Sequence, residues 1–206
     1  MLFQPTYPTN TQLDALISAQ KDKPFSYPKI HDSNATMAQK TPKGYRHDSH
    51  QFLLGHGETV FQAACEAVRA WQMFPYGWAD LYKRDTPIEV GRVVVMCARI
   101  WGFWWLNCSR IVFTVDEAHR FGFAYGTLKH HAESGEELFQ VRMNTVHKDS
   151  FVQRTPFGGE GEVFYEIQAF SRPRFWMARL ASPVARHFQR KFVKDSFENM
   201  QRAVIQ

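Results

Sequence analysis

RFGFAYGTL, residues 120–128, is the stretch of the chain with the clearest strand pattern. Large side chains and very small ones alternate along it, so one face of the strand would be aromatic. The other face carries almost no side chains, only those of Gly122, Ala124 and Gly126. A face this bare lets another backbone or a ligand approach closely. The stretch therefore predicts a sheet with an aromatic face and an unusually open reverse face.

Segments with strand character surround this stretch on both sides. Further strands are predicted at Tyr45–Leu54, Trp78–Lys83, Val90–Ile100, Arg110–Asp116, Glu137–Met143 and Val163–Ala169. The glycine-rich segment Thr155–Gly161 between the last two predicts a hairpin tip. Trp104 and Trp105 cannot both face inward from one strand, so one of them is expected at the surface, at a rim or in a turn.

Three helices are predicted beside the strands. Thr11 is a candidate cap for a short helix over Leu13–Gln20. Apolar residues at 3.6-residue spacing predict an amphipathic helix over Glu58–Gln72. Ser182 followed by Pro183 is a typical helix start, and a long C-terminal helix over Pro183–Val204 should follow.

The order of these elements predicts an α+β fold. A curved, mainly antiparallel sheet of about seven strands would grip the long C-terminal helix, because the strands follow one another through short loops. This is the helix-grip arrangement of START-like and Bet v 1-like proteins, which enclose an apolar cavity between sheet and helix. Residues 1–44 would form an N-terminal arm with a short helix, and residues 45–206 the helix-grip domain.

Cysteine content and hydropathy suggest the compartment. Three cysteines without close pairing do not make a disulfide framework. The first ten residues lack the pattern of a signal peptide. The longest apolar stretch is Val93–Leu106, which is interrupted by Arg99 and is shorter than the roughly 20 residues of a membrane span. We therefore expect no transmembrane segment and a cytoplasmic location.

The formal net charge of +5 is concentrated at the C-terminal end. Residues 172–206 hold eight Lys or Arg and two acidic residues, whereas the aromatic residues lie mostly in the strands. A single-strand nucleic-acid groove interleaves the two kinds of side chain. Because they are segregated here, we expect no DNA or RNA partner.

Several motifs resemble one uncharacterised family. They are Phe121-Gly-Phe-Ala-Tyr-Gly-Thr-Leu128, His131 with Glu133 and Gly135 to Glu137, Ala169-Phe-Ser-Arg-Pro173, and upstream Trp104-Trp-Leu-Asn107 with Val115-Asp-Glu117. The chain resembles uncharacterised protein family 0548 over roughly residues 45–200. That family usually has Pro-Gly-His-Pro where this chain has Lys129-His130-His131-Ala132, so the histidine matches and the turn residues differ. The resemblance implies a fold but no established reaction.

The first candidate site lies around the turn near Ser134 and Gly135. His131 with Glu136 or Glu137 could act as an acid/base pair, because a carboxylate can orient an imidazole and raise its basicity. The same cluster could hold a divalent metal or could be an ordinary polar turn. We assign His131, Glu136 and Glu137 as catalytic candidates, and we assign neither a metal site nor a cofactor.

The second candidate site is a ligand pocket. Tyr125 and Tyr165 would be polar groups in an apolar wall, with Phe123 and Trp104 beside them. Arg172 could hold an anionic head group or could instead pair with Glu136 or Glu137. No phosphate loop or dinucleotide motif is present.

Three functions remain open from the sequence. The first is binding of an apolar or aromatic small molecule between the sheet and the C-terminal helix. The second is acid/base catalysis in the same cavity, of cyclase, hydratase or hydrolase type. The third is an interaction module using the basic face of the C-terminal helix, with Arg179, Arg186, Arg190 and Lys194. The usual reading of such a charged face is that it is simply solvated.

Overall fold

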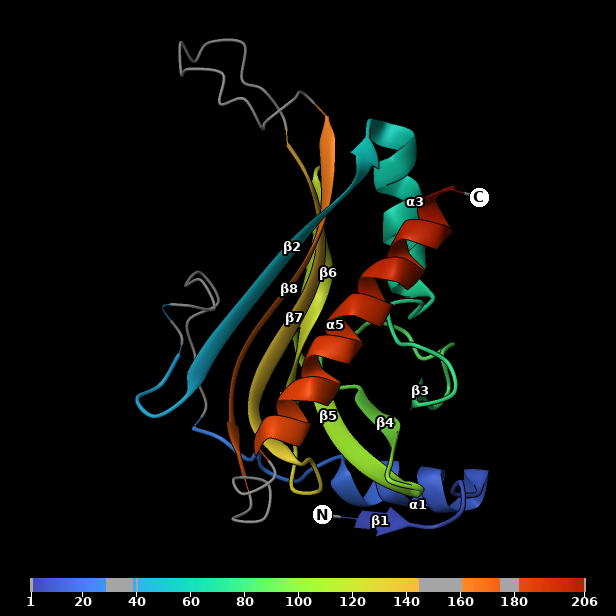
Figure 1. Cartoon of the computed structure of the whole chain (residues 1–206), viewed down its shortest axis with the longest axis vertical. Helices are drawn as coiled ribbons and strands as arrows, with labels where there is room; N and C mark the ends of the chain where they lie inside the picture. The colour runs from blue at the N-terminus through green and yellow to red at the C-terminus, as the bar shows by residue number, and fades with distance from the viewer. Residues whose placement is uncertain (1, 29–38, 40, 145–160, 175–181, 206) are drawn as a thin grey trace.

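A computed structural model describes residues 2–28, 39, 41–144, 161–174 and 182–205. Nearly all of the predicted hairpin tip Thr155–Gly161 lies outside these residues, as does Arg179. A curved sheet forms one side of the molecule and the C-terminal helix crosses its concave face (Figure 1). The predicted helix-grip arrangement is confirmed.

The sheet is antiparallel at each of its described pairings. Seven strands follow the order β2-β8-β7-β6-β5-β4-β3, and β1 pairs with β5 beside this path. The strands are β1 (Leu2–Gln4), β2 (Arg46–His56), β3 (Ala79–Leu81), β4 (Val93–Ile100), β5 (Phe103–Glu117), β6 (Arg120–Thr127), β7 (Glu133–Met143) and β8 (Glu162–Pro173). Along this path, β2 pairs with β8, which lies far from it in the sequence. Each of the other pairings on the path joins strands that follow one another in the chain.

The helices are α1 (Asn10–Gln20), α3 (Glu58–Arg69) and α5 (Ser182–Ile205). The cap of α1 differs from the prediction: Thr9, not Thr11, accepts from the Gln12 backbone N–H, and the Gln12 side chain accepts from Thr9 in return. This reciprocal capping box satisfies two backbone N–H groups at once, which Thr11 could not do. The helix therefore begins earlier than predicted.

The main core lies between the concave face of the sheet and the helices α3 and α5. Phe123 and Phe139 face each other across β6 and β7, and Trp71 and Phe74 pack on them from the segment that follows α3. Phe192 of α5 completes the cluster against Phe74. The aromatic face predicted from residues 120–128 is thus the core face.

The reverse face of the same strand is covered by the N-terminal arm. A Cβ atom on Gly126 would lie 2.1 Å from the Tyr27 hydroxyl oxygen, so only glycine leaves room for this ring. Helix α1 packs on the outer face of β4 through Leu13, which is fully buried. The bare face predicted from sequence therefore receives a segment of the chain itself.

The two adjacent tryptophans at the start of β5 lie on opposite faces, as the alternation requires. Both are half-buried, because the first residues of the chain cover them. Phe3 stacks on Trp105 with ring centroids 4.9 Å apart, and Tyr7 meets Trp104 edge-on at 4.8 Å.

Candidate functional site

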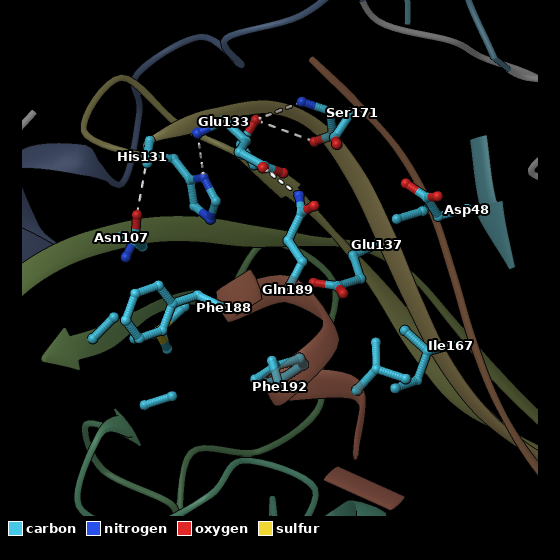
Figure 2. Close-up of a pocket in the computed structure, with 18 of the residues that line it drawn as sticks. Asp48, Asn107, His131, Glu133, Glu137, Ile167, Ser171, Phe188, Gln189 and Phe192 are labelled. Atoms are coloured by element: carbon cyan, nitrogen blue, oxygen red, sulfur yellow. Dashed lines mark hydrogen bonds between the residues drawn. The ribbon is translucent and has the colours of Figure 1, made fainter. Parts of the chain in front are cut away.

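A pocket of about 420 Å³ lies between the concave face of the sheet and the N-terminal half of α5 (Figure 2). Its lining is divided by chemistry. One part is apolar and includes Met96, Ile100, Ile167, Phe188, Phe192 and Val193. The other part is polar and includes Asn107, His131, Glu133, Glu137, Ser171 and Gln189.

The polar end exists because the ladder between β6 and β7 stops early. Regular pairing ends at Gly126 and Glu136. Beyond this point the Thr127 side chain, and not the backbone of β6, hydrogen-bonds to Gly135 of β7. The Thr127 hydroxyl accepts from the Gly135 N–H at 2.9 Å and donates to the Gly135 carbonyl at 3.1 Å. A Cβ atom on Gly135 would lie 1.8 Å from the Phe170 carbonyl oxygen, so glycine is required for the close approach of β7 to β8. The segment at residues 131–135 thereby departs from the ladder and lines the pocket.

His131 enters the pocket with its tautomer fixed. Its Nδ1 atom accepts from the Glu133 backbone N–H at 3.0 Å, so the neutral ring carries its proton on Nε2. One edge of the ring faces the pocket (Figure 2), and the protein around the rest lowers the pKa of His131 to about 4. At neutral pH His131 is therefore uncharged and carries an Nε2–H donor, and its catalytic role stays a prediction.

Glu133 connects β7 to α5 and β8. Its carboxylate accepts from the Gln189 side chain of α5 and hydrogen-bonds to Ser171 of β8 (Figure 2). Burial raises its pKa, and these hydrogen bonds oppose the increase. Beside it, the Asn107 side-chain oxygen accepts from the Ala132 N–H at 3.1 Å and holds the turn in place.

Glu137 is the titratable group of the pocket with the most unusual setting. Burial and, to a smaller extent, the nearby Glu133 charge raise the pKa of this carboxyl to about 7, and the hydrogen bond that the Tyr125 hydroxyl donates to its Oε2 atom at 2.6 Å opposes the increase. Tyr125 is 5% exposed, and burial followed by the Glu137 charge raises its own pKa. A carboxyl with a pKa near 7 can exchange a proton at physiological pH.

Glu136 does not belong with Glu137. Adjacent residues of a strand face opposite ways, and the Glu136 carboxylate accepts from the Tyr27 hydroxyl at 2.6 Å on the outer, arm-covered face. The catalytic role of Glu136 therefore stays a prediction, and the contact observed for its carboxylate joins the arm to the sheet.

Four other candidate residues are absent from the pocket lining, whereas Glu136 borders it. Phe123 and Tyr165 are fully buried in the core, and the Tyr165 hydroxyl shares a 2.8 Å hydrogen bond with Ser196 of α5. Trp104 packs with Tyr7, and Arg172 lies over the Tyr45 ring, 4.6 Å from its centroid. Tyr125 is the one ligand-binding candidate that lines the pocket.

Sequence reasoning missed several lining residues. Asn107 and Gln189 carry neutral amides, which form no motif, and Ser171 lacks the sequence context of a nucleophilic serine. Phe188 and Phe192 follow the apolar spacing of the long helix, so their sequence signal was that of ordinary core.

Charged residues stand at the edge of the pocket. Arg46 binds Asp48 through Nε and Nη2, at 3.0 and 2.6 Å. Arg186 and Arg190 also line it, although both are solvent-exposed on α5. Farther along α5, pairs four residues apart join Lys191 to Asp195 and Lys194 to Glu198. Such pairs are typical of a solvated helix face.

The remaining candidate groups are possible metal ligands and the three cysteine thiols. No three His, Cys, Asp or Glu among the described residues converge as metal ligands. The cysteines are buried, and burial raises the pKa of Cys65 to about 11 and those of Cys97 and Cys108 to about 12. Thiols in this state are poor nucleophiles.

Residues 29–199 match the sequence profile of a domain of unknown function, DUF1990. The chain belongs to the DUF1990 family. A UPF0548 protein of Dictyostelium discoideum is 34% identical, covering 96% of this chain and 93% of the relative. A UPF0548 protein of Deinococcus radiodurans is 29% identical, covering 91% and 95%. The predicted resemblance to family 0548 is confirmed.

A solved structure shares the fold of this DUF1990 chain. The hypothetical protein jhp0584 of Helicobacter pylori aligns with a TM-score of 0.53 and 9% identity, covering 85% of this chain and 97% of that one. The protein Ara h 8.0201 aligns at a TM-score of 0.49 with 12% identity, covering 79% of this chain and 99% of that one. Within the described residues, no helix is both long and apolar enough to cross a membrane.

Proposed function

We propose that this DUF1990 protein binds a small organic molecule with an apolar body and one polar end. The observation that carries the proposal is the two-part lining of the pocket under α5. Its volume of about 420 Å³ falls within the range of roughly 300–1,000 Å³ typical of small-molecule sites. Such sites combine apolar walls with a few converging polar groups, which is the composition found here.

The ligand would lie with its apolar body against Ile167, Phe188 and Phe192. Its polar end would meet the Nε2–H donor of His131 and the acceptor oxygens of Glu133 and Glu137. Because these groups come from β7, β8 and α5, the ligand would connect the sheet to the helix.

Binding can be tested with N-phenyl-1-naphthylamine, an uncharged probe whose fluorescence rises in apolar surroundings. Ala169 lies on the concave face opposite Glu137, so Ala169→Phe would fill the pocket. Ser49→Phe adds the same ring to the outer face of the neighbouring strand, where Ser49 is exposed. We expect at least about tenfold weaker probe binding in Ala169→Phe and no change in Ser49→Phe. Equal binding by both variants would refute the pocket as the site.

A second candidate function, acid/base catalysis, is favoured by the Glu137 carboxyl with its pKa of about 7. It would donate or accept a proton during cyclisation, hydration or hydrolysis of the bound molecule, with Tyr125 as its hydrogen-bond partner. Small molecules extracted from the purified protein can be returned to it and followed by mass spectrometry. Turnover by the native chain that is lost in Glu137→Gln, with probe binding retained, is the expected result. No change in either mass or chromatographic retention with the native chain would leave binding alone.

A further inference from the structure

The polar end of the pocket contains more negative than positive charge. Glu133 and Glu137 both line it, and the charge of Glu133 contributes to the raised pKa of Glu137. Their hydrogen-bond donors are neutral groups: Tyr125 for Glu137, and Gln189 and Ser171 for Glu133. Within the described part of the chain, no Lys or Arg forms an ion pair with either carboxylate.

The arginines near the pocket do not supply the positive charge that would balance Glu133 and Glu137. Arg46 pairs with Asp48, and its charge lowers the pKa of Glu133 less than the neutral donors Ser171 and Gln189 do. Arg186 and Arg190 are exposed on α5, where water screens them. The charge imbalance is therefore greatest at the buried end, where Tyr125 is 5% exposed.

Glu133 and Glu137 are half-buried, and a carboxylate that is partly removed from water without a cation partner is costly, because neutral donors replace only part of its hydration. A ligand that brings a positive charge would offset this cost and would form charge-assisted hydrogen bonds, which are about twice as strong as neutral ones. A neutral ligand gains only the ordinary hydrogen bond, and an anion is repelled by both carboxylates. The aromatic wall formed by Phe188, Phe192 and Trp78 suits the apolar body beside such a cation.

We propose that the ligand of this pocket is an organic cation, a protonated amine carried on an apolar body, whose ammonium group binds Glu137 in the field of Glu133. This inference rests on the proposed binding function and assigns its ligand class. The amine donates to the Glu137 oxygen that Tyr125 leaves free, and the apolar body extends toward Ile167 and Phe192.

The test compares three naphthalene probes of nearly equal size. They are 2-(naphthalen-1-yl)ethylamine, which is a cation, 2-(naphthalen-1-yl)ethanol, which is neutral, and naphthalen-1-ylacetate, which is an anion. Each displaces N-phenyl-1-naphthylamine at about pH 8, where a carboxyl with a pKa near 7 is ionised. We expect the amine to bind at least about tenfold tighter than the alcohol, and the anion to bind weakest.

Variants locate the charge preference. Glu137→Gln keeps the shape and can still accept from Tyr125, so we expect the alcohol to bind as before and the amine preference to fall below about threefold. Glu133→Gln should weaken the preference less. Glu66→Gln removes an exposed carboxylate from α3, far from the pocket, and should leave the preference intact.

The outcomes separate the two proposals. Equal binding of amine and alcohol, or an amine preference that survives in both pocket variants, would overturn the cation inference while binding itself stands. Displacement by none of the three probes, from a pocket whose occupancy still depends on Ala169, would also overturn it. Probe binding that is insensitive to Ala169→Phe would instead remove the binding function on which the inference rests.

Discussion

Burial acts on Glu137 and His131 in opposite directions. It raises the pKa of the carboxyl to about 7 and lowers that of the imidazole to about 4, because a buried site disfavours the charged form of each. Near neutral pH the pocket thus holds a carboxyl that can exchange a proton and an imidazole that donates from Nε2. These are the reverse of the roles that the two side chains have in water.

The stability of the protein should reflect the raised pKa of Glu137. The folded state holds this proton more tightly than the unfolded chain, so stability falls as pH rises from about 4.5 toward 7 and above. Glu137→Gln removes that loss while keeping the Tyr125 hydrogen bond. We expect the variant to be more stable than the native protein by about 1–3 kcal/mol near pH 8, with the difference vanishing below about pH 4.

Urea denaturation across this pH range measures the difference. The charges facing Glu137, those of Glu133, Asp48 and Arg46 from the sheet and Arg186 and Arg190 from α5, are unchanged between the two proteins. Glu66→Gln serves as the control and should follow the native curve. A stability difference that stays constant with pH would show that Glu137 does not titrate as described.

His131 can be followed directly by NMR. In ¹⁵N-labelled protein we expect ring nitrogen shifts of the Nε2-protonated tautomer at neutral pH, with a titration midpoint near 4. Because the folded pKa is lowered, His131 contributes stability above its unfolded pKa of about 6.5, and this is lost as pH falls toward 4. A midpoint near 6.5, or a proton on Nδ1, would contradict the geometry.

At the scale of elements, strand alternation and the helix start at Ser182 were sufficient to predict the sheet and α5. The start of β7 at Glu133 was not predictable, because it depends on the Thr127 hydroxyl replacing a ladder bond and on the close approach at Gly135. The contact made by the Glu136 carboxylate was not predictable for a related reason. Alternation separates it from Glu137, but which face was the pocket depended on a tertiary contact with Tyr27.

The arm should be coupled to the sheet through Tyr27 and Gly126. Tyr27→Phe leaves the buried Glu136 carboxylate without this donor, and we expect a loss of about 1–3 kcal/mol. Gly126→Ala places a Cβ atom 2.1 Å from the same hydroxyl oxygen and should be more costly. The double variant relieves part of that clash, so it should lose less stability than the sum of the two single variants.

Urea denaturation of all four proteins gives the coupling. Tyr76→Phe, which changes a tyrosine that is 71% exposed, should stay within about 0.5 kcal/mol of the native value. If the stability losses of Tyr27→Phe and Gly126→Ala simply added in the double variant, the Tyr27 ring and Gly126 would not be in contact.

At the scale of the whole molecule, the C-terminal half of α5 packs in the core and its N-terminal half covers the pocket. The C-terminal half is anchored in the core, where Met200 is fully buried and Phe197 stacks on Phe52 with centroids 4.4 Å apart. The N-terminal half covers the pocket and reaches the polar end of the sheet through Gln189. Ser196 and its bond to Tyr165 lie between them.

A ligand between the sheet and α5 should therefore stabilise the two halves unequally. Binding that requires the closed pocket protects backbone amides by the factor 1 + [L]/Kd, which is about a hundredfold when the probe is at 100 Kd. We expect N-phenyl-1-naphthylamine to slow hydrogen exchange strongly in residues 186–194 and little in residues 197–204, which already belong to the core. Hydrogen-exchange mass spectrometry resolves the two segments, and Ala169→Phe should abolish the effect. Uniform protection along α5 would mean that the whole helix opens as one unit, so that ligand binding stabilises the fold and not the pocket wall alone.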